Sequence, residues 1–134
     1  MTDCEKCLDE IPPVIRLVKQ VAQETNTLGR GLPTEDAARK ALPILTFLTE
    51  YFPDVIVELT QLCVAGNIQH NPELAPSDIK WARGKSKDQL NTAFRHLWDR
   101  ARGVHFDADG QPHLVKTIWR AMAQRQLDIE ESRK

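Results

Sequence analysis

Residues 86–101 have the sequence SKDQLNTAFRHLWDRA, which carries the clearest secondary-structure signal in the chain. Apolar residues recur here at the three- and four-residue spacing of one helical face. They are Leu90, Ala93, Phe94, Leu97, Trp98 and Ala101. Ser86 and Gln89 have the spacing of a capping box, in which the hydroxyl accepts from the third amide and the glutamine reaches back. The stretch therefore predicts an amphipathic helix that begins at Ser86 and ends at Gly103.

On the N-terminal side of this stretch, prolines indicate where further helices start and break. A proline pair near the start of residues 11–24 suits a first helical turn, and the apolar spacing behind it predicts a helix. A second helical region begins near Pro33 and is broken at Pro43 and again before Pro53. Pro53 then opens a helix that continues over residues 54–68.

On the C-terminal side, residues 107–110 (DADG) predict a tight turn, and Pro112 restarts a helix whose charged end, residues 128–134, is expected to fray. No segment alternates apolar and polar residues as a strand would. The predicted fold is therefore all-α, a compact bundle of four to five helices. The non-periodic residues 25–34 suggest a linker, so we expect an N-terminal helix and linker (residues 1–32) and a helical domain (residues 33–134).

Composition limits the possible partners and location. The chain has 134 residues, 41% of them hydrophobic and 28% charged, with a formal net charge of −1. This near-neutral balance argues against duplex nucleic acid and membrane surfaces as partners. No apolar run reaches the roughly 20 residues of a membrane span, so we expect a cytoplasmic protein. Of the three cysteines, Cys4 and Cys7 have the two-residue spacing of one ligand pair of a zinc site. A metal or redox role and an incidental pair both remain open.

Two polar stripes can carry chemistry. In the predicted helix of residues 86–101, Asp88, Asn91, Arg95 and Asp99 share one face, which can either hold a divalent cation or be a solvated surface. The final helix presents a stripe of basic residues that can bind polyphosphate or be ordinary surface charge, and Lys40, Lys85 and Arg95 present the same two alternatives. The stripe consists of His113, Lys116 and Arg120.

The non-periodic segment 66–85 concentrates side chains that recognise nucleotides. Gln69, His70 and Asn71 can hydrogen-bond a base or sugar, and Trp81 can stack on a base or close over the core. The chain has no P-loop, no dinucleotide-binding glycine motif and no zinc-protease motif. A nucleotide pocket of another kind is therefore a hypothesis at this point.

An ordered series of short motifs indicates which protein family the chain resembles. The series is Arg39-Lys40-x-x-Pro43-Ile44, Tyr51-Phe52-Pro53-Asp54, Gly66-Asn67-x-Gln69-His70-Asn71-Pro72, Trp81, Lys85-Ser86, Arg95-His96-Leu97, Asp109-Gly110-x-x-His113 and Trp119-Arg120. It resembles the dATP/dGTP diphosphohydrolase family of phage and bacterial genomes, which is related to the MazG-like all-α nucleoside triphosphate pyrophosphatases. The resemblance covers residues 39–127 and implies cleavage of a (deoxy)nucleoside triphosphate, with purine deoxynucleotides favoured, into monophosphate and pyrophosphate.

The resemblance also implies a metal site for Mg²⁺ or Mn²⁺. MazG-like proteins carry E-x-x-E on one helix and E-x-x-D on the next, and the nearest match here is Glu58-x-x-Gln61 followed by Asp88-x-x-Asn91. Glu58, Asp88 and Asn91 are thus the expected metal-binding residues, with Glu58 and Asp88 also catalytic. His96 is expected to act as a general base or to support a ligand. Because an amide replaces the second carboxylate of each pair, a non-catalytic nucleotide-binding or interaction protein on the same scaffold is the alternative.

The remaining site residues are expected from the same resemblance to contact the substrate: basic side chains neutralise phosphates, polar loop residues bind sugar or base, and an indole stacks. They are Lys40, Gln69, His70, Asn71, Trp81, Lys85, Arg95, His113 and Lys116. MazG-like enzymes build their sites between associated subunits, so a homodimer or homotetramer is implied as well.

Overall fold

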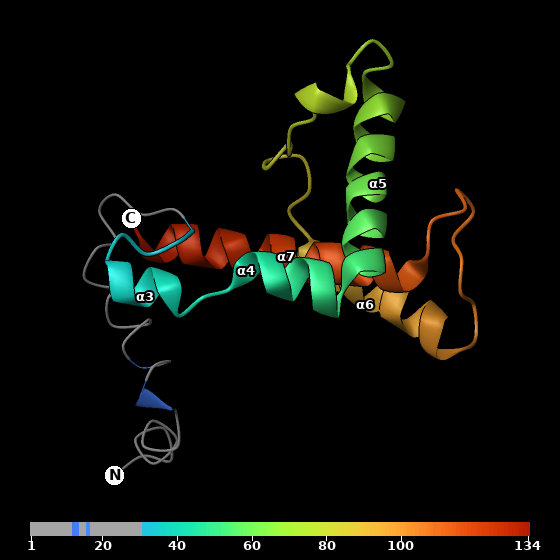
Figure 1. Ribbon diagram of the computed structural model, residues 1–134. Helices are drawn as coiled ribbons and strands as arrows, with labels where there is room; N and C mark the ends of the chain where they lie inside the picture. Colours follow the sequence, from blue (N-terminus) through green and yellow to red (C-terminus); the bar gives the residue numbers. More distant parts are fainter. Residues whose placement is uncertain (1–11, 14–15, 17–30) are drawn as a thin grey trace. The chain divides into compact units, whose positions relative to one another are not determined.

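The computed structural model describes residues 12–13, 16 and 31–134 (Figure 1). They belong to two structural units, Met1–Thr49 and Glu50–Lys134. Among the described residues the regular elements are helices, apart from one isolated β-bridge between Phe106 and Pro112, so the predicted all-α fold is confirmed. The predicted helix over residues 11–24 lies largely outside the described residues. The cysteine pair near the N-terminus lies wholly outside them.

The part of the first unit that the structure describes continuously, residues 31–49, contains two short helices separated by a proline. Helix α3 (Asp36–Lys40) begins after Glu35, whose carboxylate accepts hydrogen bonds from the amides of Ala37 and Ala38. Helix α4 (Ile44–Thr46) follows Pro43, and a π-helix, η1 (Phe47–Tyr51), continues from it. The predicted break at Pro43 is confirmed, because proline cannot donate the hydrogen bond that a continuous helix requires.

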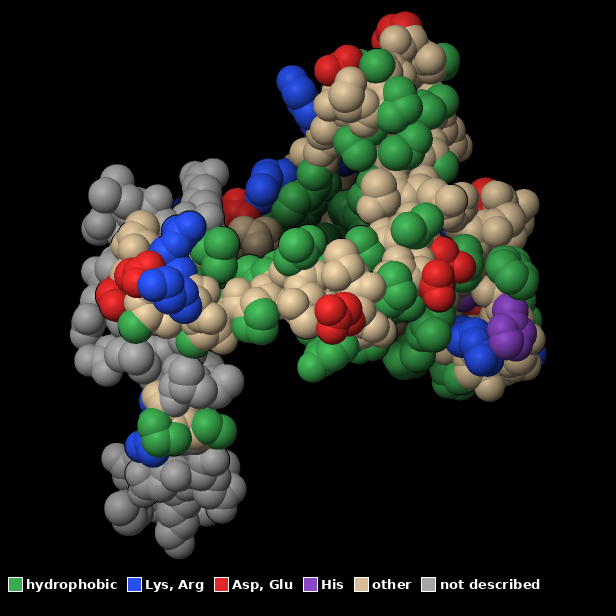
Figure 2. Space-filling model, in the orientation of Figure 1, with side chains coloured by type: hydrophobic (Ala, Val, Ile, Leu, Met, Phe, Trp, Pro, Cys, Tyr) green, Lys and Arg blue, Asp and Glu red, His purple; other side chains and the backbone are tan. Residues whose placement is uncertain are grey.

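Helix α5 (Pro53–His70) opens the second unit and starts at the proline that the sequence indicated. It is followed by a short 3₁₀ helix, η2 (Pro76–Asp78), and an irregular segment that leads to α6. Hydrophobic side chains are exposed along α5 (Figure 2), among them Val57 and Ile68. None of the described helices combines the length and the apolar character that crossing a membrane requires.

Helices α6 (Gln89–Ala101) and α7 (His113–Ser132) run side by side, and α5 stands across this pair (Figure 1). Small buried residues allow the close approach: Ala93 of α6 and Ala123 of α7 are almost fully covered. The segment between the helices turns back through Gly103 and Gly110, which have φ of +92° and +79° and so favour glycine. The predicted helix end and tight turn are both confirmed.

The start of α6 differs from the prediction. The helix begins at Gln89, its N-cap residue is Asp88, and no side chain caps it, so the predicted capping box at Ser86 is wrong. Gln89 is 2% exposed, and its side-chain amide oxygen, Oε1, accepts a hydrogen bond from Arg120 of α7. The contact of Gln89 with Arg120 on α7 therefore replaces the predicted capping interaction with Ser86. At the other end of the unit, α7 stays helical through most of the segment expected to fray.

Much of the apolar face that predicted α6 is exposed in the single chain. Leu90 is 64% exposed and Phe94 is 58% exposed. Leu97 and Trp98 are also exposed, whereas Ala93, on the edge toward α7, is buried. The hydrophobic periodicity thus identified the helix correctly, but the second unit alone leaves that face uncovered.

Candidate nucleotide site and neighbouring histidine–aspartate cluster

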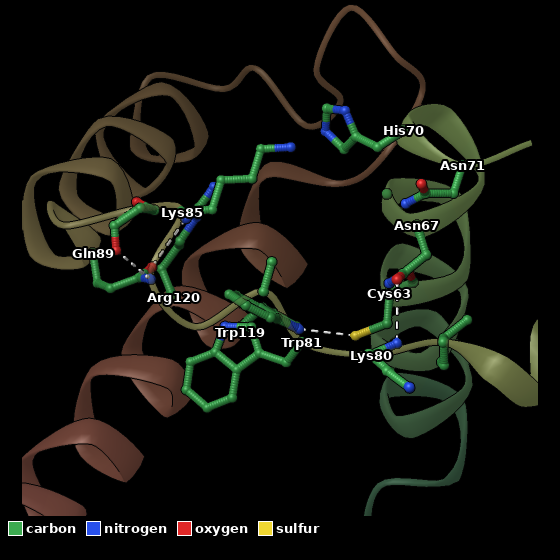
Figure 3. Close-up of a pocket in the computed structure, with 14 residues that line it drawn as sticks. Cys63, Asn67, His70, Asn71, Lys80, Trp81, Lys85, Gln89, Trp119 and Arg120 are labelled. Carbon is green, nitrogen blue, oxygen red and sulfur yellow. Dashed lines mark hydrogen bonds between the residues drawn. The ribbon is translucent and has the colours of Figure 1, made fainter. Parts of the chain in front are cut away.

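A cavity of about 540 Å³ lies between α5 on one side and the starts of α6 and the middle of α7 on the other (Figure 3). We call it the tryptophan cavity, because Trp81 and Trp119 both line it. Its other lining residues come from the end of α5, from the irregular segment and from α6 and α7. They are Cys63, Gly66, Asn67, His70, Asn71, Ile79, Lys80, Ala82, Lys85, Ser86, Gln89 and Arg120.

The two indoles form an ordered aromatic wall. Their ring centroids are 5.7 Å apart and the planes meet at 85°, an edge-to-face arrangement. The Trp119 Nε1–H donates to the Cys63 Sγ at 2.9 Å, and the guanidinium of Arg83 lies over the Trp81 ring at 4.3 Å. These contacts from three sides fix the orientation of the rings that face the cavity.

The cavity is rich in positive charge that no acid balances. Lys80, Lys85 and Arg120 line it, and none of the described residues that line it is Asp or Glu. In Figure 3 the Lys85 side chain extends toward His70 across the cavity. Arg120 donates to the amide oxygen of Gln89 at 3.0 Å, so its described hydrogen-bond partner is neutral. Burial, and then the nearby Arg95 guanidinium, lowers the pKa of Arg120. An anion placed here would relieve that unbalanced charge.

A second cavity, of about 290 Å³, shares Cys63, Gly66, His70, Trp119 and Arg120 with the first. It also contains Gln69, His96, Asp109 and Lys116, so it borders a different chemical environment. Next to it lies a group that we call the His–Asp cluster, which consists of His96, Asp107 and His113. Their potential ligand atoms all lie within 4.8 Å of one another.

The two histidines of this cluster are in direct contact. The Nδ1 atoms of His96 and His113 are 2.9 Å apart, and His113 is 4% exposed. Desolvation, followed by the charge of Lys116, lowers the pKa of His96, although Asp107 opposes the shift. The neutral imidazole is therefore favoured at His96.

Lys116 is held by two aspartates beside the cluster. Its Nζ lies 2.6 Å from Asp107 Oδ2 and 2.7 Å from Asp109 Oδ2. Burial works against the ammonium, but these hydrogen bonds prevail and raise the pKa of Lys116. The hydrogen bond from Lys116 in turn lowers the pKa of both aspartates. Lys116 is thus already neutralised within its own chain.

Comparison with protein families identifies the chain. The model of the dATP/dGTP diphosphohydrolase N-terminal family matches residues 33–134. The chain belongs to this family. It is accordingly a member of a family of nucleotide hydrolases, as the order of its motifs predicted. No curated protein and no solved structure matches the chain significantly.

Several residues that the family resemblance nominated are brought together. His70, Asn71, Trp81 and Lys85 all line the tryptophan cavity. Gln69, His96 and Lys116 line the second cavity, and His70 belongs to both. His113, nominated for the substrate, is buried and lies instead in the His–Asp cluster.

Other nominated residues lie apart from these cavities. Glu58 lines a separate cavity with Arg100 and His105, near the C-terminal end of α6. Asp88 and Asn91 are exposed at the opposite end, separated from Arg100 by ~18 Å and ~13 Å of helix axis, respectively. The three expected metal-binding residues therefore do not converge within one chain.

Two nominated basic residues have local partners. Lys40 belongs to the first unit, where it pairs with Asp36 at 2.7 Å on an exposed surface. Arg95 is exposed on α6 and donates to the Thr92 hydroxyl at 3.0 Å. Arg95 is not among the residues that line the tryptophan cavity.

The sequence left three contributors unrecognised. Gln89 was interpreted as a cap, and Asp107 and Asp109 as turn residues, although they hold Arg120 and Lys116. One signal was available: a stripe of cations on the final helix requires nearby acceptors, and the turn directly before it carries two aspartates. Nothing local indicated that Gln89 would be buried.

Proposed function

We propose that the chain hydrolyses a purine deoxynucleoside triphosphate, dATP or dGTP, to the monophosphate and pyrophosphate. The observation that carries the proposal is the tryptophan cavity, where an aromatic wall stands beside unbalanced positive charge. A nucleoside triphosphate has the complementary features, a flat base and a polyanionic tail. Family membership supports the same substrate class.

The lining residues suggest how the nucleotide lies. The base fits against Trp81, where stacking is available to any base and purines offer the larger surface. Asn67, His70 and Asn71 supply hydrogen-bonding groups at the end of α5 for sugar or base. Lys85 and Arg120 provide positive charge for the phosphates, and charge-assisted hydrogen bonds of this kind are the stronger ones.

In the proposed reaction a water oxygen bonds to the α-phosphorus and the bond from that phosphorus to the α,β-bridging oxygen breaks. The pyrophosphate leaves with the bridging oxygen, and the proton of the water passes to a base. A divalent cation, Mg²⁺ or Mn²⁺, supplies charge neutralisation and a more acidic water when bound. His96 is suited to accept a proton or to support a ligand, since both roles need the neutral imidazole that its burial favours.

The expected metal-binding residues, Glu58, Asp88 and Asn91, do not fit one ion within one chain, and no step is assigned to them there. We propose that they meet between two copies, Glu58 from one chain and Asp88 and Asn91 from the other. The exposed apolar residues of α6, among them Leu90 and Phe94, supply a surface that such a homodimer or homotetramer can bury.

A product assay tests the activity. The full chain is incubated with each dNTP and NTP and with Mg²⁺ or Mn²⁺, and pyrophosphate and monophosphate are quantified. We expect both products, in equal amounts, from dATP or dGTP. Nucleotide binding in calorimetry without products would favour the alternative of a non-catalytic nucleotide-binding module. No binding of any nucleotide would contradict both.

Subunit mixing tests the shared metal site. Glu58→Gln and Asp88→Asn should each lower turnover by about 100-fold or more, because metal-assisted hydrolysis loses a carboxylate ligand. Glu73→Gln, in an exposed loop, is the matched control. If each site takes Glu58 and Asp88 from different copies, mixing the two inactive variants restores about one quarter of wild-type activity in a symmetric dimer. Inactive variants whose mixture stays inactive, although subunits exchange, would exclude the shared site.

A further inference from the structure

The His–Asp cluster brings together side chains from three elements, and the proposed reaction gives a role only to His96. His96 comes from α6, Asp107 from the connecting segment and His113 from the first residue of α7. Among the described residues, this is the group whose histidine and carboxylate atoms come close enough to share one ion. It contains none of Glu58, Asp88 and Asn91.

The spacing of its atoms suits coordination. The Nδ1 atoms of His96 and His113 are 2.9 Å apart, and two imidazole nitrogens bound to one tetrahedral zinc ion are separated by about 3.3 Å. A small rotation of either ring bridges that difference. Asp107 accepts from the Ala108 amide and from Lys116, yet a carboxylate has about four lone-pair positions and retains capacity for a ligand bond.

The surroundings of His113 orient its Nδ1 so that this atom can also bind a metal ion. Its Nε2 lies 3.9 Å from Asp99 Oδ2, beyond hydrogen-bond distance, and the negative charge of that carboxylate favours the ring proton on Nε2. The Nδ1 of His113 then presents its lone pair to His96 Nδ1, 2.9 Å away. A carboxylate behind a histidine is the usual support of a metal-bound imidazole. The ring is 4% exposed and therefore held in this orientation by its packing.

The charges around the cluster are mixed: at His96 those of Lys116 and Arg120 outweigh that of Asp107 and help to lower the pKa of the ring, while acids surround the other members. Asp107 and Asp109 bring two negative charges against the one positive charge of Lys116, and Asp99 adds another negative charge on the far side of His113. Two imidazoles and one carboxylate form a donor set that suits Zn²⁺ and similar transition ions better than Mg²⁺, which prefers oxygen ligands.

We propose that His96, Asp107 and His113 bind one first-row transition-metal ion, of which Zn²⁺ is the type, at the wall of the second cavity. Three protein ligands leave a coordination position for water or a phosphate oxygen. His96 lines that cavity together with Arg120, so the ion lies next to the proposed nucleotide. Binding of the ion requires no nucleotide and is independent of the proposed hydrolysis.

Cobalt titration tests the site directly. Metal-free full-length protein is titrated with Co²⁺, whose visible absorption reports coordination by nitrogen ligands, and Zn²⁺ is then added as a competitor. We expect one equivalent of Co²⁺ per chain, displaced by one equivalent of Zn²⁺, and a higher melting temperature with either ion. Absence of a stoichiometric signal at micromolar protein would overturn the proposal.

Variants assign the ligands. His96→Asn and Asp107→Asn should each weaken binding at least tenfold, a loss in the range seen even for second-sphere changes around metals. His105→Ala removes an exposed histidine of the same connecting segment and should leave the affinity unchanged. Helicity measured by circular dichroism identifies any variant that fails to fold. If Asp107→Asn does not fold, Asp107→Glu replaces it in the test, and because it keeps a carboxylate it should retain partial metal binding. Full affinity in folded His96→Asn would refute the assignment, whatever the hydrolysis assay shows.

Discussion

The tryptophan cavity and the His–Asp cluster are neighbours with opposite electrostatic arrangements. In the cavity, Arg120 is held by the neutral amide of Gln89, and no described Asp or Glu lines the walls. Beside the cluster, Lys116 is bound by both Asp107 and Asp109. We therefore expect a basic residue to bind an anion where its partner within the chain is neutral, and to have a structural role where acids already surround it.

This contrast separates two basic residues that occupy one stripe of α7. Lys116 and Arg120 are four residues apart in the basic stripe, but only Lys116 was among the residues expected to contact the substrate. Their partners come from different elements, the connecting segment for Lys116 and the start of α6 for Arg120. Substitutions at these partners and at the basic residues themselves test whether this difference governs nucleotide binding.

The largest effect is expected from Arg120→Ala. Hydrogen bonds to charged groups contribute about 1.5–3 kcal/mol, so the dissociation constant for dATP or dGTP should rise about 10- to 150-fold. Arg125→Ala, on the same helix but outside the cavity lining, is the control. Nucleotide calorimetry measures both. Equal affinities of the two variants would remove Arg120 from the nucleotide site.

A smaller effect is expected from Gln89→Glu, which introduces the acid that the cavity lacks. The new carboxylate would lie near the Arg120 guanidinium, now 3.0 Å from the Gln89 oxygen, and neutralise it. We expect nucleotide affinity to fall about tenfold, as a like charge placed near the phosphates costs about 1.4 kcal/mol. The salt dependence of binding should weaken in parallel. Unchanged affinity with unchanged salt dependence would mean that the phosphates lie elsewhere.

The positions of the helices could be predicted from local residue chemistry, whereas the side-chain contacts between helices could not. Pro43 and Pro53 end and start helices because their rings exclude the regular hydrogen bond, which a sequence shows directly. Residue type likewise indicated Trp81 and Lys85 as nucleotide-binding candidates. The burial of Gln89 could not be predicted, because it depends on Arg120, 31 residues away.

The position of Lys116 illustrates the same limit at the site. Its aspartate partners are seven and nine residues earlier, and they reach it because the segment reverses through Gly110 with a positive φ. From the residue types of the stripe alone, Lys116 is expected to be a free cation. The turn geometry makes it an ion pair, which is why the proposed nucleotide site assigns the phosphates to Lys85 and Arg120 and not to Lys116.

The smallest effect on nucleotide binding is therefore expected from Lys116→Met, which keeps the length of the stem and removes the charge. Because Asp107 and Asp109 already balance that charge, the dissociation constant should change by less than about threefold, against the larger loss in Arg120→Ala. Unfolding should become easier by roughly 1 kcal/mol, since two aspartates lose their common partner in a partly exposed setting. Calorimetry and chemical denaturation separate the two effects. A loss of affinity in Lys116→Met as large as in Arg120→Ala, with stability unchanged, would show that the two cations of α7 act alike and that the contrast between the regions does not govern binding.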